Sequence, residues 1–416
     1  MSIKGSVNPP GDKSISHRAG LFSLLATGTC RVSNFSPCAD CASTLEAVSR
    51  LGGRVERQGE EVVLHGAAGK LVSAAVDCGN SGTTMRLLMG LLAGRPGSFT
   101  LDGDASLRRR PMSRVADPLM RMGAQVSTTD GRPPVTIEGA ALNGQRHELA
   151  VASAQLKSAL LLAGLQAQGE TVVIEPHLSR DHTERLLTAM GADIAPADEG
   201  GWRVRPSALV LPPSLRVPGD VSAAAFMLVG AIITPGSEVT TLGVGLNPGR
   251  VGLISVLQRM GAKLTVTEEG RDPEPWGKVS AAYTPELKAT EVLPQEIPLL
   301  VDEVPILALA ATQAQGVTVM RSINELRIKE SDRIAAIVTQ LGALGARLWE
   351  EGEDLFIEGP APLKPQGRYD SYGDHRIAMT LAIAGVLCGQ TLEVADAACA
   401  GVSYPDFYRD LEALQQ

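Results

Sequence analysis

The sequence predicts a mixed α/β protein of two domains, each built from three copies of one structural unit. Three observations support this prediction. At 416 residues the chain is too long for one core of ordinary size. A short phrase of an apolar residue, a glycine and a small residue returns five times, each time after a helical pattern and before a strand-like one. The glycines of this phrase are Gly52, Gly123, Gly191, Gly261 and Gly345, spaced by 71, 68, 70 and 84 residues.

Each repeat unit predicts the order strand, helix, strand, helix, strand, strand. Apolar-periodic stretches such as Val115 to Met122 indicate a helix that ends in a glycine C-cap. Alternating residues on either side of a polar turn, as in 54–56 and 62–64, are typical of a strand pair. Earlier in each unit, a polar cluster opens an Ala/Leu-rich helix and a glycine turn ends it. A β-branched strand then follows, as in 79–97 and 98–101.

The chain is expected to cross between its two domains twice. The sixth unit stops at its second helix, 404–416, so we expect the amino-terminal strand, 3–8, to supply its missing last strands. One domain is then predicted over 1–11 and 221–416, and the other over 12–220. Both crossings carry a Pro-Gly-Asp sequence, which favours hinge movement between the domains.

Composition excludes several classes of protein. The net charge of −8 argues against a general binder of nucleic acid or membrane surfaces. Without a signal-peptide pattern or an apolar run long enough to span a bilayer, the expectation is a soluble cytoplasmic protein. Cys38 and Cys41 form one isolated C-x-x-C, which favours incidental thiols over zinc or redox use. No P-loop, G-x-G-x-x-G or metal-ligand spacing supports a nucleotide cofactor or a metal.

The openings of the six first helices of the units can be compared directly. They are Lys13-Ser14, Asn80-Ser81-Gly82-Thr83, Ser153-Ala154-Gln155, Asp220-Val221-Ser222, Asp302-Glu303 and Asp374-His375-Arg376. Helix capping accounts for the serine, aspartate and asparagine residues. It does not account for Lys13, Gln155, His375 or Arg376. If these helices point their amino ends at a shared cleft, their dipoles add to a field suited to a polyanion.

Basic clusters strengthen this expectation. They are 108–110, Arg180 in 179–182, and Arg327, Lys329 and Arg333 in 326–333. Each cluster alone fits a solvated surface as well, but together they favour one or two phosphorylated or carboxylated small molecules. The adjacent charges of Lys329 and Glu330 suit proton transfer. Asp302 follows an apolar stretch, so either a raised pKa or a simple helix cap fits its position.

These ordered motifs together resemble the 5-enolpyruvylshikimate-3-phosphate synthase family, and the resemblance runs essentially end to end. The residues that carry it are Gly11-Asp12-Lys13-Ser14 with Arg18, Gly79 to Thr83 with Arg86, Arg110-Pro111-Met112, Ser153-Ala154-Gln155, Arg180-Asp181-His182, Gly219-Asp220, Asp302-Glu303, Arg327 to Arg333 and Asp374-His375-Arg376. The family fold has two domains, each with three βαβαββ repeats in an inside-out barrel, joined by two crossovers. This is the layout that the repeats predict independently.

The resemblance implies transfer of the enolpyruvyl group of phosphoenolpyruvate to the 5-hydroxyl of shikimate 3-phosphate, a step of aromatic amino-acid (chorismate) biosynthesis. Phosphate leaves by addition and elimination through a tetrahedral intermediate, and no cofactor or metal is required. A monomer with no nucleic-acid or membrane partner is expected. Arginines that clamp phosphate and carboxylate, and charge fixed around the intermediate, make this chemistry reasonable.

The resemblance also implies which residues hold the substrates. Those expected to hold shikimate 3-phosphate are Lys13, Ser14, Arg18, Ser153, Ala154, Gln155, Arg180, Asp302 and Lys329. Those expected to hold phosphoenolpyruvate are Lys13, Asn80, Gly82, Arg110, Gln155, Arg333 and Arg376. The expected catalytic residues are Asp302, Lys329, Glu330, Lys13 and His375. Asp302 takes the proton of the attacking hydroxyl, and Glu330 serves the methylene carbon as acid and then base, with Lys13 and Lys329 as alternatives for that proton.

Four positions depart from the best-known branch of the family. Asp12 replaces a usual serine, His17 and Glu325 replace asparagines, and Val402 replaces a lysine, which puts a fifth phosphoenolpyruvate contact in doubt. Glu325, Ala154 and the stretch 104–107 are similar to a second, glyphosate-tolerant branch. Gly82, in contrast, leaves room for the inhibitor, so the response to glyphosate stays open.

Two other functions were weighed. The sister enolpyruvyl transferase that acts on UDP-N-acetylglucosamine shares the fold but uses a loop cysteine and a lysine-asparagine pair. Here the loop 103–111 has no cysteine and Lys13 is followed by Ser14. The second is a non-catalytic phosphoanion-binding module of the same fold. The presence of Asp302, Lys329, Glu330 and His375 argues against it.

Overall fold

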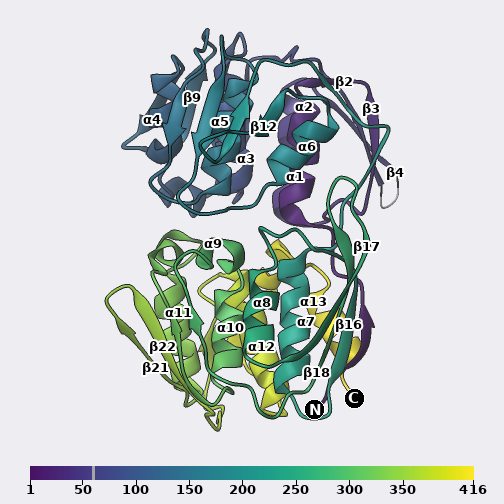
Figure 1. Cartoon of the computed structure of the whole chain (residues 1–416), viewed down its shortest axis with the longest axis vertical. Coiled ribbons are helices and arrows are strands. Elements are labelled where there is room, and N and C mark those ends of the chain that lie inside the picture. The colour runs from purple at the N-terminus through teal and green to yellow at the C-terminus, as the bar shows by residue number, and fades with distance from the viewer. Residues whose placement is uncertain (59–60) are drawn as a thin grey trace. The chain divides into compact units, whose positions relative to one another are not determined.

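The computed structural model describes residues 1–58 and 61–416, and it divides the chain into two compact domains (Figure 1). Domain A consists of Met1–Pro10 and Pro218–Gln416, and domain B of Gly11–Val217. Each domain has its own hydrophobic core. The fold class is mixed α/β, as the sequence predicts. The strands over the described residues form separate sheets of two or four strands and no closed barrel.

Domain B repeats one sheet pattern in its described part. Each four-stranded sheet begins with a parallel pair and continues with antiparallel strands, in the orders β15-β3-β5-β4, β6-β7-β9-β8 and β10-β11-β13-β12. The strands are β2 Ala26–Thr27, β3 Thr29–Ser33, β4 Arg54–Gln58, β5 Glu61–His65, β6 Ala74–Asp77, β7 Ser98–Asp102, β8 Gln125–Thr129, β9 Arg132–Glu138, β10 Arg146–Glu148, β11 Thr171–Ile174, β12 Ile194–Pro196, β13 Trp202–Val204, β14 Leu209–Val210 and β15 Ser214–Arg216. The helices are α1 Lys13–Phe22, α2 Ala39–Arg50, α3 Gly82–Ala93, η1 Leu107–Arg109, α4 Ser113–Arg121, α5 Ala154–Gly164 and α6 His182–Ala189.

Domain A follows the same pattern in the sheets β1-β16-β18-β17 and β19-β20-β22-β21, and adds a two-stranded sheet of β23 and β24. Its strands are β1 Lys4–Val7, β16 Glu238–Gly245, β17 Lys263–Gly270, β18 Trp276–Ala282, β19 Glu291–Val292, β20 Gly316–Met320, β21 Arg347–Glu351, β22 Asp354–Gly359, β23 Tyr369–Asp370 and β24 Val394–Ala395. Its helices are α7 Val221–Ile233, α8 Gly252–Arg259, α9 Ile297–Leu300, α10 Val304–Ala311, η2 Asn324–Ile328, α11 Arg333–Ala343, α12 His375–Leu387, η3 Ala397–Val402 and α13 Phe407–Leu414.

The repeat predicted from the sequence is confirmed. The five repeat glycines, Gly52, Gly123, Gly191, Gly261 and Gly345, have φ values of 94°, 104°, 84°, 86° and 91°. Each follows the end of a unit's second helix, where a left-handed residue closes the helix without the steric penalty of a Cβ. The polar turn expected between β4 and β5 includes residues 59–60, which lie outside the described residues.

The expectation that the amino-terminal strand completes the sixth unit is wrong. β1 instead pairs in parallel with β16, from Lys4 beside Glu238 to Val7 beside Thr241. The reason lies in the domain crossing: β15, which precedes α7, stays in domain B beside β3, so the parallel edge position next to β16 is open. β1 fills that position, and the sixth unit keeps only its β23–β24 pair, with an antiparallel bridge from Ile3 to Gln415 near its end.

Helices form the centre of each domain and sheets surround them. In domain A, α7, α10 and α12 pack against one another between the sheet of β21 and β22 and the sheet of β16 and β18 (Figure 1). Every residue of α7 and of α10 is buried, as expected of helices that are apolar all round. In domain B, α3 packs against α1 and α5. Over the described chain, none of the helices has the length and apolar character required to cross a bilayer.

The two chain crossings run side by side. The backbone N–H of Asp220 donates to the carbonyl oxygen of Pro10 at 2.8 Å. In domain B, the Asn34 amide donates to the carbonyl oxygen of Val217 at 2.9 Å, and a Cβ at Gly11 would lie 1.8 Å from the carbonyl oxygen of Asn34. Only a glycine fits at this position, immediately before α1.

Gly11→Ala is therefore expected to lower the free energy of unfolding by at least about 1–3 kcal/mol, because backbone must move to relieve the overlap. Chemical denaturation checks this value. Gly342→Ala is the matched control, because its Cβ meets nothing within 4 Å and it lies inside α11, where alanine is preferred by up to about 1 kcal/mol. Equal stabilities of the two variants would contradict the close approach at Gly11.

Candidate active site

Candidate residues gather at the amino ends of the first helices, and a polar side chain caps most of these ends. Asp12, Ser81, Ser153, Asp220 and Asp374 each accept a hydrogen bond from a backbone N–H of the helix that follows. α10 differs, because Glu303 occupies its cap position without such a bond. Asp302 is therefore not the helix cap that its position also allowed.

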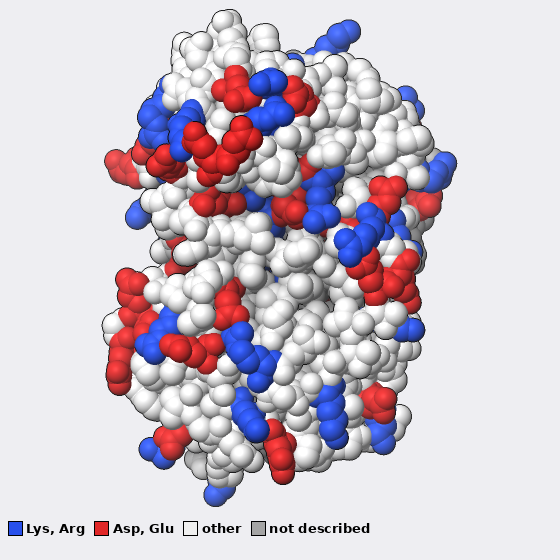
Figure 2. Space-filling view, in the orientation of Figure 1, with Lys and Arg blue, Asp and Glu red and all other residues white. Residues whose placement is uncertain are grey.

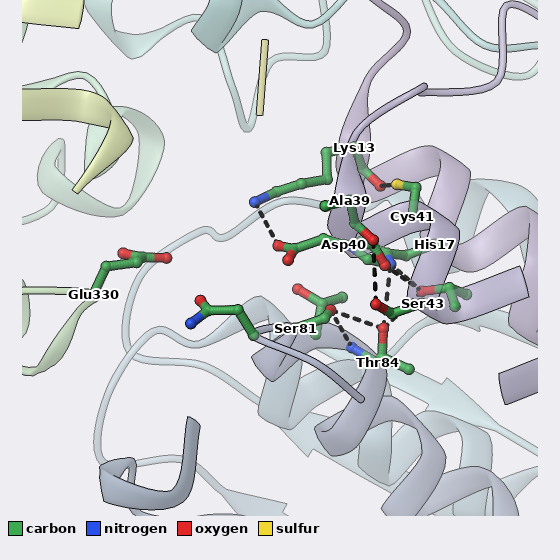
Figure 3. A network of polar contacts seen from close by, with 12 residues as sticks. Lys13, His17, Ala39, Asp40, Cys41, Ser43, Ser81, Thr84 and Glu330 are labelled. Atoms are coloured by element: carbon green, nitrogen blue, oxygen red, sulfur yellow. Dashed lines mark hydrogen bonds and ion pairs between the residues drawn. The ribbon is translucent and has the colours of Figure 1, made fainter. Parts of the chain in front are cut away.

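Lys13, the first residue of α1, forms an ion pair with a residue of α2. Its Nζ lies 3.1 Å from Oδ2 of Asp40, and Figure 3 shows the amine turned toward that carboxylate. The pair is partly exposed, so the lysine charge stays accessible to an anion. Asp12 accepts from the Ile15 N–H at 3.0 Å, so the departure from serine at this position preserves the cap.

His17 is fully buried one turn into α1. Its Nδ1 lies 2.6 Å from Oγ1 of Thr44 on α2, and Thr44 lies 2.6 Å from Oγ1 of Thr84 on α3 (Figure 3). Burial, together with the charges of Lys13 and Arg18, holds the pKa of His17 well below its usual range. A neutral histidine thus joins the starts of three helices.

Guanidinium groups from two elements surround Gly82, the first residue of α3. Arg110 donates to Oδ1 of Asn80 at 2.7 Å, and Arg86 donates to Oε1 of Gln155 at 2.5 Å. The Gln155 amide donates in turn to Oγ1 of Thr83 at 2.9 Å, which ties α5 to α3. Four residues expected to hold phosphoenolpyruvate, Asn80, Gly82, Arg110 and Gln155, are therefore brought together in domain B.

Arg18 is the centre of a second group in domain B. Its side chain is buried and donates to Oγ1 of Thr183 at 2.7 Å, to Oγ of Ser158 at 2.8 Å and to the Ser14 carbonyl oxygen at 2.9 Å. These contacts join α1, α5 and α6. Ser153 caps α5 and Arg180 lies two residues before α6, so both stand at the ends of the same helices. The family resemblance implies that both residues hold shikimate 3-phosphate.

In domain A, Arg333 gathers three carboxylates. Arg333 is the first residue of α11 and is about 1% exposed. Its Nε lies 2.8 Å from Asp374, its Nη2 lies 2.6 Å from Glu330, and its Nη1 lies 3.4 Å from Asp302. Burial alone lowers the pKa of Arg333, but the three carboxylates outweigh it and raise the pKa above its ordinary value. The guanidinium therefore stays charged.

Lys329 lies half-buried in the loop between η2 and α11, beside this cluster. Burial and the charge of Arg333 lower its pKa, and the charges of Asp302 and Glu330 oppose them; the net direction is down. An amine with a lowered pKa next to two carboxylates is suited to proton transfer. The sequence expectation that Lys329 and Glu330 are electrostatically coupled agrees with this geometry.

Several residues without a role predicted from the sequence hold the candidate site together. Glu303 accepts from the Ser222 hydroxyl and lies 3.9 Å from Arg376. Arg250 donates to Asp220 and to Ser222, both at 2.7 Å. Arg250 and Asp40 could have been found from the repeat, because each lies near the start of a unit's second helix. Arg110, Arg180 and Arg333 lie at the same place in other units.

The face of the molecule drawn in Figure 2 carries no large area of charge of one sign. On the face drawn in Figure 2, lysine and arginine side chains alternate with aspartate and glutamate. Within residues 1–58 and 61–416, no group of three or more histidine, cysteine, aspartate or glutamate side chains could hold a metal ion. Cys38 is the cap residue of α2, and both it and Cys41 are buried free thiols.

Comparisons with known proteins agree with one another over the whole chain. A family model described as EPSP synthase (3-phosphoshikimate 1-carboxyvinyltransferase) matches residues 1–411. The chain belongs to the EPSP synthase family. This confirms the resemblance found in the sequence and the enolpyruvyl transfer that the resemblance implies.

Two relatives and two structures show how far the family match extends. A 3-phosphoshikimate 1-carboxyvinyltransferase of Synechococcus sp. is 48% identical, and one of Bacillus licheniformis is 43% identical; each match covers 100% of this chain and 98% of the relative. An EPSP synthase structure from Acinetobacter baumannii has a TM-score of 0.87 at 39% identity, with coverage of 99% and 96%. The enolpyruvyl transferase NikO of Streptomyces tendae shares the fold, with a TM-score of 0.79 at 20% identity over 99% of this chain and 95% of that one.

Proposed function

We propose that the described residues carry out the family's reaction as two half-sites, with anion binding in domain B and proton transfer in domain A. The observation that carries this proposal is the cluster of Asp302, Lys329 and Glu330 around the buried Arg333. It supplies a proton acceptor, a proton donor and a fixed positive charge within a few ångströms. A structural scaffold has no need of a buried Arg333 and Asp374 with two further partly buried carboxylates beside them, because such charges are expensive to desolvate.

Domain B would bind both anions of the reaction. Arg110, supported by Asn80, faces Gly82 together with Arg86, and such paired guanidiniums suit a phosphate or a carboxylate. Lys13 and the dipoles of α1, α3 and α5 add positive potential. Arg18, Ser153 and Arg180 would hold shikimate 3-phosphate beside this group. The ordering of two reactants at adjacent positions supplies a large part of the rate.

Domain A would move the protons. Asp302 would accept the proton of the attacking 5-hydroxyl as its oxygen adds to carbon 2 of phosphoenolpyruvate. Glu330 would protonate the methylene carbon, and the same carboxylate would remove a proton from the resulting methyl group as phosphate leaves. Lys329, Arg333 and Arg376 would stabilise the charge that develops on the carboxylate and phosphate oxygens. His375 would stand beside this cluster, and Lys13 and Lys329 stay alternatives for the carbon acid.

We also propose that the two half-sites face one cleft and that shikimate 3-phosphate closes it about the crossings at Pro10 and Pro218. The hydrogen bond between Asp220 and Pro10 supports a shared hinge. Closure is expected to lower the radius of gyration in small-angle scattering when shikimate 3-phosphate is added. An unchanged scattering curve at saturating ligand would count against closure.

The working form proposed is a cytoplasmic monomer without a nucleic-acid or membrane partner, and the net charge of −8 supports the lack of polyanionic partners. Size-exclusion chromatography with light scattering tests the oligomeric state. A dimer at micromolar concentration would contradict it.

A phosphate-release assay tests the reaction itself. Phosphate is expected only when shikimate 3-phosphate and phosphoenolpyruvate are both present, and mass spectrometry is expected to find the enolpyruvyl ether in equal amount. Release only with UDP-N-acetylglucosamine would assign the chain to the sister activity. Tight binding of both anions without release would indicate the non-catalytic module.

Gly82→Ala is expected to raise KM for phosphoenolpyruvate about tenfold. The added Cβ would lie 3.1 Å from Nη1 of Arg86 and 3.3 Å from Nη1 of Arg110, so it would crowd the space between the two guanidiniums. Steady-state kinetics with each substrate varied in turn checks this. A larger change in KM for shikimate 3-phosphate would contradict the placement of phosphoenolpyruvate beside Gly82.

A further inference from the structure

A buried charge cluster lies under the shikimate 3-phosphate half of domain B. Nζ of Lys157 lies 2.7 Å from Oε2 of Glu175 and 2.8 Å from Oε1 of Glu184. The exposed fractions of these three side chains are 0%, 7% and 0%. We call Lys157, Glu175 and Glu184 the buried triad. None of the three residues was assigned a role above.

The buried triad joins three separate segments. Lys157 is in the first turn of α5, Glu184 is in the first turn of α6, and Glu175 follows the end of β11. The Ser179 hydroxyl donates to Oε1 of Glu175 at 2.5 Å, so the loop that carries Arg180 is anchored to the same cluster. The triad is therefore linked to every segment that presents Ser153, Gln155 and Arg180.

A second link between α5 and α6 lies one residue further along α5 and one residue earlier on α6. Ser158 and Thr183 lie 2.6 Å apart, and both accept from Arg18. Successive helix residues point about 100° apart, so the two links hold different faces of α5 and α6. Two links on different faces restrict rotation as well as separation of the helix ends.

The charges of the buried triad do not favour stability as its main role. One ammonium and two carboxylates are removed from water, and such buried ion groups are often no more stable than well-packed apolar residues of similar volume. Burial raises the pKa of Glu184, although the Lys157 charge opposes this shift. The buried triad instead holds its three charged groups, and the segments that carry them, at fixed distances from one another.

We propose that Lys157, Glu175 and Glu184 are positioning residues that set the spacing between the amino ends of α5 and α6 and so determine affinity for shikimate 3-phosphate. This inference rests on the proposed function, because it assumes that Ser153, Gln155 and Arg180 hold that substrate. The residues touch no reacting atom; they act through the helix ends.

The test compares Lys157→Met with wild type in steady-state kinetics and in calorimetric binding of shikimate 3-phosphate alone. KM and Kd for shikimate 3-phosphate are expected to rise at least tenfold, whereas KM for phosphoenolpyruvate and kcat change less than about threefold. Glu184→Gln, which keeps side-chain volume and hydrogen bonding, is expected to raise KM and Kd for shikimate 3-phosphate with the same selectivity but by a smaller factor. It also replaces Lys157→Met if that variant does not fold.

Two controls separate positioning from folding. Phe99→Leu, in the core of domain B on β7, is expected to lower Tm without changing the ratio of the two KM values. The triple variant Lys157→Met/Glu175→Gln/Glu184→Gln removes all three charges of the buried triad. Its Tm is therefore expected to return toward the wild-type value while KM for shikimate 3-phosphate stays raised.

Either of two results would overturn the proposal: recovery of that KM with Tm in the triple variant, or equal KM changes for both substrates in Lys157→Met and Glu184→Gln. Absence of turnover in the wild type would instead refute the proposed function.

Discussion

Replacing Lys329 by methionine is expected to lower kcat by about 10²-fold or more, the usual scale for removal of an acid–base or electrostatic group. Methionine preserves most of the volume of the side chain and removes only the amine. The lowered pKa of Lys329 places its titration below the ordinary value of 10.5, because burial and Arg333 disfavour the ammonium. Asp302→Ala is expected to lower kcat by a similar factor.

The pH dependence of kcat is expected to follow the protonation of Lys329. A group that acts as an ammonium is active below its pKa, so wild-type kcat is expected to fall as pH rises through the lowered pKa of Lys329. The residual rate of Lys329→Met is expected to lack this basic limb. Lys288→Met, at an exposed position of domain A, is the control and is expected to keep the wild-type profile. Near-normal turnover in Lys329→Met and Asp302→Ala would refute the assignment.

Replacing Arg333 by methionine is expected to remove activity and to lower the free energy of unfolding by about 3–5 kcal/mol, the scale for breaking a buried ion pair on one side. Asp374, wholly buried, would lose the guanidinium that lies 2.8 Å from it, and Glu330 and Asp302 would lose their shared partner. Circular dichroism during urea unfolding measures the loss. Arg321→Met is the control, because this exposed arginine also contacts two carboxylates but is expected to lose at most about 1 kcal/mol.

The stability loss in Arg333→Met is expected to depend on pH. In the wild type, burial raises the pKa of Asp374, but Arg333 outweighs it and the net shift is downward. A carboxylate whose folded-state pKa is depressed stabilises the protein above its unfolded pKa, and that contribution is lost as pH falls through the folded value. Without Arg333 the buried carboxylate favours its protonated form, so the variant regains stability as pH falls. The difference between the two proteins is therefore expected to shrink from pH 7 to pH 4. A constant difference would contradict the pairing.

Repetition explains how much of the fold the sequence could predict. Helix ends recur before Gly52, Gly123, Gly191, Gly261 and Gly345 because a left-handed residue is needed there, and glycine marks that need locally. The partner of β1 could not be predicted in this way. Strand pairing across more than 200 residues depends on which edge position the domain crossing leaves open, and the sequence of 4–7 does not encode it.

Some residues of the candidate site could likewise be predicted from the sequence and others could not. Lys13, Gln155 and Arg376 stand out in the sequence because a helix cap does not require them. Lys157 does not stand out, since a charged residue in a helical first turn is ordinary until its burial is known. Val402 is the last residue of η3, ahead of α13 in the sixth unit, whereas four other units have an arginine near the start of their second helix.

In the proposed mechanism the enolpyruvyl group is transferred by addition and elimination, and side chains of domain A transfer the proton at carbon 3. The most direct test runs the reaction in D₂O and follows deuterium in the methylene group of recovered phosphoenolpyruvate and product by NMR. Deuterium is expected in recovered phosphoenolpyruvate and in product, and only when the two substrates are present together. In Glu330→Gln this deuterium is expected to be lost. Phosphate release without any deuterium at carbon 3 would contradict the account.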